Sequence, residues 1–202
     1  MKQRTATVIG ATGLIGGHLL DILLGDNYFD NIKVIVRRPV EISNPKVSVV
    51  IIDFSDEEDF RNSISGSDVV FCAIGTTNKK VKGDKEAYRK VDYDIPVNAS
   101  KYCSETGCRK FAFISSVGAD SKSKNFYLRL KGEVEDELYR SNIKTILIFR
   151  PSILLGKREE FRPGEEISKA LVSPFSFLIP SKYRPVKAHD VAGSMVTASK
   201  RE

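Results

Sequence analysis

The stretch that decides the fold lies near the start of the chain and reads Val8-Ile9-Gly10-Ala11-Thr12-Gly13-Leu14-Ile15-Gly16-Gly17. It predicts a buried strand, a tight turn and the first turn of a helix. Gly10 lets the chain turn sharply off the strand, Gly13 lets the backbone approach a pyrophosphate, and Gly16 lets the helix pack close to the sheet. Phosphates would bind the free N–H groups at the positive end of that helix. The stretch therefore predicts a dinucleotide-binding loop, although a loose glycine pattern also occurs in ordinary turns.

Short apolar runs alternate with helical stretches along the first two-thirds of the chain. We expect strands at 6–9, 32–36, 47–52, 69–73, 111–114 and 145–149. We expect helices at 14–24, 56–63, 85–105 and 124–140, with Gly107 capping the third of them. Each strand is almost continuously apolar, which is typical of strands buried on both faces. The alternation predicts an α/β fold, a Rossmann-type doubly wound parallel sheet with helices on both faces.

Prolines divide the last quarter of the chain into short pieces; they are Pro151, Pro163, Pro174, Pro180 and Pro185. Helices are expected there at 165–172 and 190–199, with Asp190 as the N-cap of the second. About fifty residues are too few for an independent domain. We therefore expect a single domain over 1–202, with a dinucleotide-binding core at 1–150 and a small substrate-side lid at 151–202.

The composition indicates a globular protein, because 41% of the 202 residues are hydrophobic and 29% are charged. No apolar run approaches the roughly 20 residues that a membrane-spanning helix needs. The first residues contain no apolar signal-peptide core, so a cytoplasmic protein is expected. Three cysteines indicate reduced structural thiols rather than a disulfide framework or a zinc site, and no metal is expected.

The net charge of +6 bears on partners. Basic residues form small clusters at Lys79-Lys80-Lys82-Lys85 and at Arg37-Arg38, without a basic face interleaved with aromatic residues. Nucleic acid is therefore not an expected partner. The lysine cluster predicts a solvated loop beside the cofactor, and it would also attract an anionic substrate.

The second strand ends in Arg37-Arg38 and lacks the acidic residue that accepts a hydrogen bond from the ribose 2′-hydroxyl of NAD. One guanidinium can bind a 2′-phosphate and the other can stack on adenine, so NADP(H) is favoured over NAD. A pair of solvated arginines is the alternative. Residues after the next two strands are expected along the same cofactor: Asp53 and Phe54 flanking the adenine, then Ile74, Gly75 and Thr76.

Tyr127 and Lys131 lie one turn apart on one face of a predicted helix. The ammonium would stabilise the deprotonated phenol and hold the nicotinamide ribose, while the phenol protonates a carbonyl oxygen as hydride arrives. A second Tyr-x-x-x-Lys, from Tyr183 to Lys187, contains Pro185 and cannot form a regular helix. It is an internal control for the motif.

Ser115 and Ser116 end the fifth predicted strand. A hydroxyl at this position would donate a hydrogen bond to the substrate carbonyl and complete a Ser–Tyr–Lys set. Ser116 is slightly preferred over Ser115, and an ordinary Ser/Gly turn is the alternative.

Several motifs together resemble the Tat-interacting-protein oxidoreductase family of atypical short-chain dehydrogenases/reductases; they are residues 10–13, 37–38, 71–77, 115–120, 127–135, 149–151 and 162–165. The resemblance covers nearly the whole chain. It implies an NADPH-binding Rossmann fold with Tyr127 as the active-site tyrosine. It also implies cofactor contacts at Thr12, Gly13, Leu14, Ile15, Arg37, Arg38, Ile74, Gly75, Tyr127, Lys131, Leu154 and Arg162.

The leading hypothesis is an NADPH-dependent reductase of a small carbonyl compound. A non-catalytic NADPH sensor acting through a protein partner is a second hypothesis, although binding alone does not need the Tyr127 phenol. A nucleotide-sugar epimerase or dehydratase fits the glycine spacing but would need a long C-terminal substrate domain. The helices carrying 91–102 and 127–138 are the candidates for a homodimer interface. His18 and His189 fall in no motif and are expected to be structural.

Overall fold

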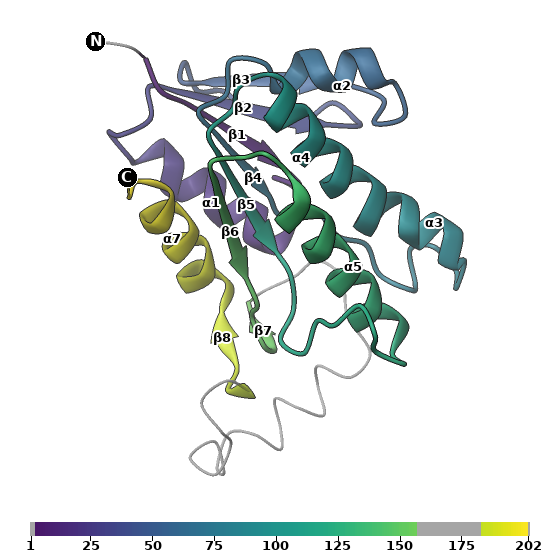
Figure 1. Cartoon of the computed structure of the whole chain (residues 1–202). Helices are drawn as coiled ribbons and strands as arrows, with labels where there is room; N and C mark the ends of the chain where they lie inside the picture. The colour runs from purple at the N-terminus through teal and green to yellow at the C-terminus, as the bar shows by residue number, and fades with distance from the viewer. Residues whose placement is uncertain (1–2, 157–182, 202) are drawn as a thin grey trace.

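Six parallel strands form one sheet in the order β3-β2-β1-β4-β5-β6 (Figure 1). The computed structural model describes residues 3–156 and 183–201. The strands are β1 (Thr5–Ile9), β2 (Asn31–Val36), β3 (Val47–Ile51), β4 (Val69–Cys72), β5 (Lys110–Ile114) and β6 (Thr145–Phe149). The strand order reverses at β1, where Val8 pairs with Val34 of β2 and with Phe71 of β4. Ligands of doubly wound sheets bind at such a reversal, beyond the carboxyl ends of the strands.

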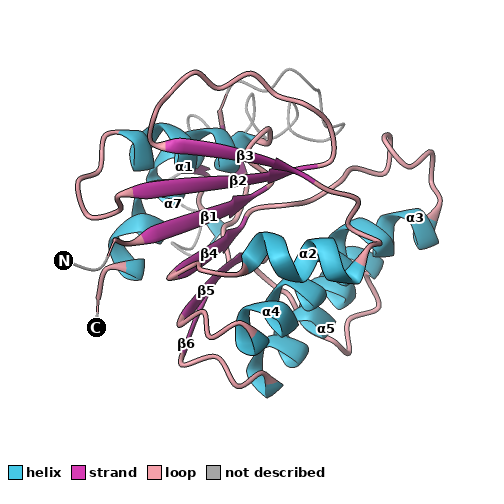
Figure 2. Ribbon diagram, turned by 90° about the horizontal axis from the view of Figure 1, so that it is seen from above, coloured by secondary structure: helices cyan, strands magenta, loops and turns pink. Residues whose placement is uncertain are grey.

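Helices cover both faces of the sheet, as Figure 2 shows from above. One face carries α1 (Leu14–Leu24) and α7 (Ala188–Ser199), and the other carries α2 (Glu57–Ile64), α4 (Ile95–Glu105) and α5 (Phe126–Arg140). A short helix, α3 (Lys85–Arg89), leads into α4 through the π-helical segment η1 (Lys90–Asp94), and β7 (Leu154–Leu155) pairs with β8 (Val186–Lys187). The predicted doubly wound α/β fold is confirmed.

Each helical layer has its own apolar core. Leu19 and Leu23 of α1 and Met195 of α7 are fully buried in one cluster. Phe60 of α2 and Leu138 of α5 are fully buried in the other cluster. At roughly 25 cal/mol per Å² of apolar surface, burial on both faces is the main force that holds the layers to the sheet.

The edge strands depart from the prediction that every strand is buried on both faces. All residues of β4 are buried, whereas Ile51 at the end of β3 is 54% exposed and β6 is half-buried throughout. An edge strand has a neighbour on one side only, and the helices do not cover it completely. An apolar run therefore does not distinguish an edge strand from a central strand.

The helix predicted over 85–105 is one helical run with a π segment inside it. Pro96 has no N–H to donate to the carbonyl of Asp92 four residues earlier, and η1 ends just before it. At the far end, Gly107 has φ +76° and the Cys108 N–H donates to the Cys103 carbonyl at 2.9 Å. This arrangement is a Schellman motif and confirms the predicted glycine cap.

The last helix begins two residues earlier than predicted. Lys187 is its N-cap and Asp190 lies in its first turn, so the N-cap assignment of Asp190 was wrong. An acidic residue is favourable in the first turn as well, because it faces the positive end of the helix dipole. Since α7 packs in the α1 layer, it is part of the sheet's helical cover. The predicted helix at 165–172 lies outside the described residues, and the division into core and lid stays a prediction.

Candidate functional site

The glycine loop has the tight geometry that the sequence predicts. Gly10 has φ +89°, and a Cβ there would lie 2.8 Å from the Ala73 carbonyl carbon. A Cβ on Gly16 would lie 2.0 Å from the Gly10 oxygen, so only glycine lets α1 approach the turn this closely. The Gly13 N–H donates to the Gly10 carbonyl at 2.9 Å and closes the turn. The predicted backbone roles of Gly10 and Gly16 are confirmed.

The same loop leaves the start of α1 open to a ligand. Its N-cap is Gly13, which has no side chain to satisfy the free N–H groups, and its first turn contains no acidic residue. Thr12 and Gly13 are exposed, Leu14 is half-buried, and Ile15 and Gly16 are buried. A pyrophosphate fits this cradle, because the backbone N–H groups and the helix dipole both favour an anion.

The carboxyl ends of β2 and β3 lie on the same side of the sheet as this loop, because the strands are parallel. Arg37 and Arg38 are exposed directly after β2. Asp53 follows β3 and accepts hydrogen bonds from the Ser55 N–H at 2.9 Å and from the Ser55 hydroxyl at 2.8 Å. These hydrogen bonds lower the pKa of Asp53. Phe54 is half-buried and packs edge-to-face on a core phenylalanine of α2.

The residues after β4 are tied to the π segment. The Thr76 N–H donates to Asp92 Oδ2 at 2.7 Å, and the Tyr88 hydroxyl donates to the Thr76 carbonyl at 3.3 Å. A Cβ on Gly75 would lie 3.3 Å from Asp92 Oδ1. Ile74 is half-buried and Gly75 is exposed. The segment predicted to follow the cofactor is thus held in place by Asp92 and Tyr88.

Asp92 and Lys131 form a buried ion pair that our sequence analysis did not predict. Lys131 Nζ lies 3.3 Å from Asp92 Oδ1, and both side chains are at most 4% exposed. The ammonium also donates to the Ile114 carbonyl at 3.3 Å and lies 6.0 Å from the centre of the Tyr127 ring. Because a buried charge is costly without a counter-ion, Asp92 compensates the charge of Lys131 beside Tyr127.

The two candidate serines differ in their surroundings. The Ser115 hydroxyl is buried and has no hydrogen-bond partner among the described residues. Ser116 is half-buried, and its hydroxyl donates to the Val117 carbonyl at 3.3 Å. An unpaired buried hydroxyl is rare and is a free donor for a ligand. This observation favours Ser115, whereas the sequence slightly favoured Ser116, and the choice between them stays open.

A cavity of about 340 Å³ opens beside Tyr127. It is lined by Asn78, Gly83, Lys85, Tyr88, Asn125, Phe126 and Tyr127. The side-chain oxygen of Asn125, the N-cap of α5, accepts from the Leu128 N–H at 3.1 Å and fixes the start of the helix. The helix start and the turn after β4 therefore enclose the space in front of the phenol.

Asp92 and Tyr88 were missed by the sequence analysis, but a signal for Asp92 existed. Tyr88, Asp92, Ile95 and Ala99 follow one another at helical spacing and are all buried. A carboxylate on an otherwise apolar helical stripe indicates a buried partner of opposite charge.

The remaining predicted residues are placed as follows. Lys187 lies in the strand β8, so the second Tyr-x-x-x-Lys does not form one regular helix, as predicted, and Tyr183 is 46% exposed. Leu154 lies in β7, and a Cβ on the nearby Gly156 would lie 2.8 Å from a methyl group of Leu14. This segment therefore lies against the glycine loop. Arg162 lies outside the described residues.

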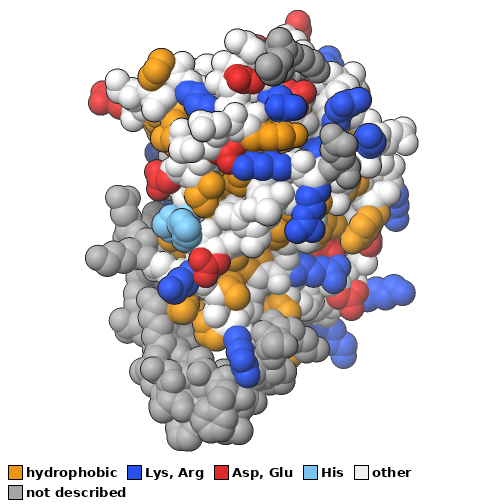
Figure 3. Space-filling view, turned by 90° about the vertical axis from the view of Figure 1, so that its left-hand side faces the viewer, with side chains coloured by type: hydrophobic (Ala, Val, Ile, Leu, Met, Phe, Trp, Pro, Cys, Tyr) orange, Lys and Arg blue, Asp and Glu red, His pale blue; other side chains and the backbone are white. Residues whose placement is uncertain are grey.

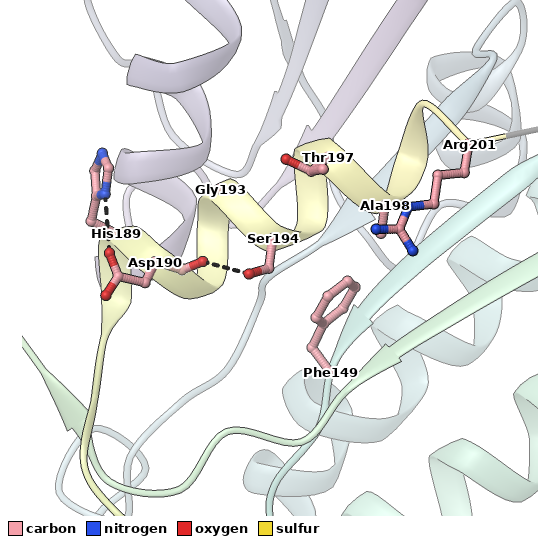
Figure 4. A pocket seen from close by; sticks show the side chains of 8 residues that line it. All are labelled: Phe149, His189, Asp190, Gly193, Ser194, Thr197, Ala198 and Arg201. Carbon is pink, nitrogen blue, oxygen red and sulfur yellow. Dashed lines mark hydrogen bonds and ion pairs between the residues drawn. The ribbon is translucent and has the colours of Figure 1, made fainter.

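A larger cavity, about 540 Å³, lies between α7 and the edge strand β6 (Figure 4). It is lined by Phe149, His189, Asp190, Gly193, Ser194, Thr197, Ala198 and Arg201, none of which belongs to a predicted site. The contacts drawn in Figure 4 are internal to α7: His189 lies 3.6 Å from Asp190, and the Ser194 hydroxyl donates to the Asp190 carbonyl at 2.8 Å. We therefore place the candidate site at Tyr127.

The two histidines join α1 to α7 at the surface. The rings of His18 and His189 pack edge-to-face with their centres 5.6 Å apart. Figure 3 shows this side of the molecule, with histidine atoms in pale blue and with lysines and arginines scattered among acidic and apolar side chains. The three cysteines are buried and free, and burial raises the pKa of the Cys72 thiol to about 12. The two histidines and the three cysteines thus contact the packed interior or a neighbouring helix, and none of them lines the cavity beside Tyr127.

Sequence comparison identifies the family. A family model described as NAD(P)H-binding matches residues 10–198. The chain belongs to the NAD(P)H-binding family. The chain is 34% identical over 172 residues to Protein HTATIP2 of Rattus norvegicus, covering 84% of this chain and 70% of that protein. It is 35% identical over 157 residues to Protein FMP52, mitochondrial, of Debaryomyces hansenii, covering 77% and 69%. The resemblance to the Tat-interacting-protein oxidoreductases is thereby confirmed.

Structural comparison agrees with the family assignment. The crystal structure of the Bordetella bronchiseptica enzyme WbmH in complex with NAD+ superposes with a TM-score of 0.72, covering 98% of this chain and 72% of that chain. The sequence identity is 16%, so this similarity shows a shared Rossmann fold and no more. Among the described residues, no helix combines the length and apolarity that crossing a membrane requires.

Proposed function

We propose that the protein is an NADPH-dependent oxidoreductase that reduces a small carbonyl compound, with Tyr127 as the general acid. The observation that carries the proposal is the position of Tyr127, which borders the 340 Å³ cavity and has the Lys131 ammonium 6.0 Å from its ring centre. An open helix start and a free Ser115 hydroxyl complete the set of groups that such a reaction needs.

Each group has a defined part in the proposed reaction. NADPH, when bound, supplies the hydride that adds to the carbonyl carbon. The Tyr127 hydroxyl donates its proton to the carbonyl oxygen, which becomes the alcohol. Ser115 or Ser116 donates a hydrogen bond to the same oxygen. Lys131 stabilises the phenolate left behind, and Asp92 is the counter-ion of that ammonium in its buried position.

Substitution of Tyr127 tests the reaction. A panel of small aldehydes, ketones and quinones is screened by following NADPH consumption. Tyr127→Phe keeps the ring packing and removes the proton donor, so turnover is expected to fall roughly 100-fold or more while NADPH affinity is retained. Tyr139→Phe is the matched control, because Tyr139 lies on the same helix and is 66% exposed. Turnover that Tyr127→Phe leaves unchanged would exclude the phenol as the acid.

The choice of NADP(H) rests on Arg37 and Arg38. Both side chains are exposed at the end of β2, where a 2′-phosphate would give them an anionic partner. We expect NADPH to bind at least roughly tenfold more tightly than NADH, and the Arg37→Ala/Arg38→Ala variant to lose this preference. The chain contains no tryptophan, so bound NADPH can be followed by its fluorescence. Arg109 is also exposed, but it lies at the amino ends of the strands, directly before β5. Arg109→Ala should therefore leave the preference for NADPH intact.

A non-catalytic NADPH sensor is the second candidate function. The buried ion pair favours this candidate. Asp92 lies 3.3 Å from the Lys131 ammonium and already balances the charge that a catalytic Tyr127 would use. NADPH binding without turnover of any panel compound would support this candidate.

Location and assembly are also proposals. We propose a cytoplasmic protein, whereas the matched FMP52 relatives are named mitochondrial; microscopy of the tagged full-length protein distinguishes the two. We propose a homodimer through the outer faces of α4 and α5, with neither nucleic acid nor membrane as a partner. A monomer in sedimentation at micromolar concentration would contradict the dimer.

A further inference from the structure

The cavity beside Tyr127 has walls that the reduction of a carbonyl group does not by itself require. The rings of Tyr88 and Phe126 pack edge-to-face with their centres 5.6 Å apart. The hydrogen bond from the Tyr88 hydroxyl to the Thr76 carbonyl holds this pair against the turn after β4. The result is a fixed aromatic wall next to the phenol, which favours a planar apolar ligand.

A cation stands at the rim of this wall. Lys85 lines the cavity, and its Nζ lies 5.6 Å from the centre of the Phe126 ring. Lys85 forms no ion pair with the residues that the structure describes. Its neighbour Asp84 accepts hydrogen bonds from the N–H groups of Glu86 at 2.8 Å and Ala87 at 3.1 Å, as the N-cap of α3. The other adjacent carboxylate, Glu86, lies 3.3 Å from Lys90 Nζ. Both carboxylates next to Lys85 in the sequence therefore have other partners, and Lys85 is available to a ligand.

Positive charge surrounds the opening on two sides. The Gly83 N–H donates to the Asn78 carbonyl at 3.0 Å, so both ends of this turn line the cavity and its lysines lie close to the opening. The lysines of the turn are Lys79, Lys80 and Lys82. On the other side, Lys122 and Lys124 are exposed just before the start of α5. Asp120, the acidic residue beside them, accepts from the Lys122 N–H at 2.9 Å.

We propose that the substrate is an aromatic or similarly planar carbonyl compound that bears an anionic group, most simply a carboxylate. This inference rests on the proposed reductase function. The carbonyl end lies at Tyr127, the planar part packs on Tyr88 and Phe126, and the anionic end binds Lys85. The other lysines around the opening raise the local concentration of an anion and speed its entry.

The kinetic test compares 4-carboxybenzaldehyde with its neutral methyl ester at equal NADPH. The acid is expected to have a kcat/KM at least about tenfold higher, and salt should reduce the difference by screening the lysines. Lys85→Gln should reduce the preference to about threefold or less. Lys144→Gln makes the same change of charge on an exposed lysine between α5 and β6 and should leave the preference unchanged. Equal kcat/KM for acid and ester would overturn the inference and leave the reductase function standing.

A binding test keeps the inference separate from turnover. Titration of 4-fluorobenzoate and 4-fluorobenzamide is followed by 19F NMR, with and without NADPH. Tighter binding of the benzoate that Lys85→Gln abolishes would support the anion site, even if no aldehyde is reduced and the proposed function fails. If the benzoate and the amide bind alike, or neither binds, the anion site is overturned.

Discussion

The two helical layers differ in the polar groups that they bury. In the α1 and α7 layer, the buried polar side chain in the described helices is Ser199, whose hydroxyl donates to the Val196 carbonyl of its own helix. The opposite layer buries three charged groups, Asp92 in η1 and Lys131 and Glu135 in α5. Both layers also contain a large apolar cluster, so hydrophobic burial alone would hold either layer in place.

The difference shows that the two layers serve a ligand in different ways. The α1 side offers backbone, because its glycines bring a turn and a helix start close together and leave N–H groups open. The opposite side offers side chains, because Asp92 and Lys131 hold a charge below Tyr127. Binding of a ligand by the backbone of the α1 side requires glycines, because a Cβ atom would fill the space. Binding by side chains on the opposite side requires that each buried charge, such as that of Lys131, has a counter-ion.

Breaking the buried ion pair is expected to have the largest effect on stability. Asp92→Ala leaves the Lys131 ammonium buried without a counter-ion, and we expect the free energy of unfolding to fall by about 3–5 kcal/mol. Glu133→Ala is the control, because Glu133 pairs with Arg89 at 2.7 Å while both side chains are at least 31% exposed. That exposed pair should contribute no more than about 1 kcal/mol. Urea denaturation measures both values.

A double variant sharpens this prediction. Asp92→Leu combined with Lys131→Met removes both charges, and it should recover much of the stability that Asp92→Ala loses. Equal losses for Asp92→Ala and Glu133→Ala would show that burial of the pair does not matter and would remove the distinction between the layers.

The backbone side is tested by two adjacent glycines of α1. Gly16→Ala places a Cβ 2.0 Å from the Gly10 oxygen, so the turn must shift. We expect a loss of about 1–3 kcal/mol in stability and loss of NADPH binding. In Gly17→Ala the new Cβ would meet its nearest neighbour at 3.7 Å, an ordinary contact, and the helix should gain up to about 1 kcal/mol. NADPH binding by Gly16→Ala at unchanged affinity would contradict the cradle.

The smallest effect is expected at the ion pair that links the α1 and α7 sides of the same layer, between Asp26 and Lys200. Burial raises the pKa of Asp26, but hydrogen bonds from Lys200 and the Tyr28 N–H outweigh it and lower the pKa overall. A lowered folded-state pKa stabilises the protein above the unfolded value near 3.8, and this contribution is lost as the pH falls through the folded-state value.

Asp26→Asn should therefore cost at most about 1 kcal/mol at pH 7. The difference from the unmodified protein should shrink as the pH falls below about 4. Asp21→Asn, at an exposed position of α1, is the control and should change the stability at pH 7 by no more than about 0.5 kcal/mol. A constant difference across this range would exclude the pair as its source.

Much of the fold could be predicted because its signals are local. The helix α1 and the strand β6 have the predicted bounds. A glycine turn marks the start of α1, and a short run of β-branched and large apolar residues marks β6. The sequence does not show that β3 and β6 are the edge strands, because this depends on which strands pair in the folded sheet.

The residues of the candidate site that belong to one sequence motif could be predicted. The residues that meet only through the tertiary fold were missed. Tyr127 and Lys131 lie on one helix, so their spacing shows that they share a face. The partner of Lys131 lies in η1, which becomes π-helical near Pro96, and no local pattern connects Asp92 to Lys131. The aromatic cavity wall likewise joins α3 to the start of α5 through tertiary packing.

The hydrogen bonds after β4 connect the cavity to the residues behind the phenol. Tyr88 contacts the Thr76 carbonyl, the Thr76 N–H contacts Asp92, and Asp92 contacts Lys131. A molecule that packs on Tyr88 therefore restrains the same segment that a dinucleotide would follow. We expect the two ligands to bind cooperatively, each raising the affinity for the other by the same factor whichever arrives first.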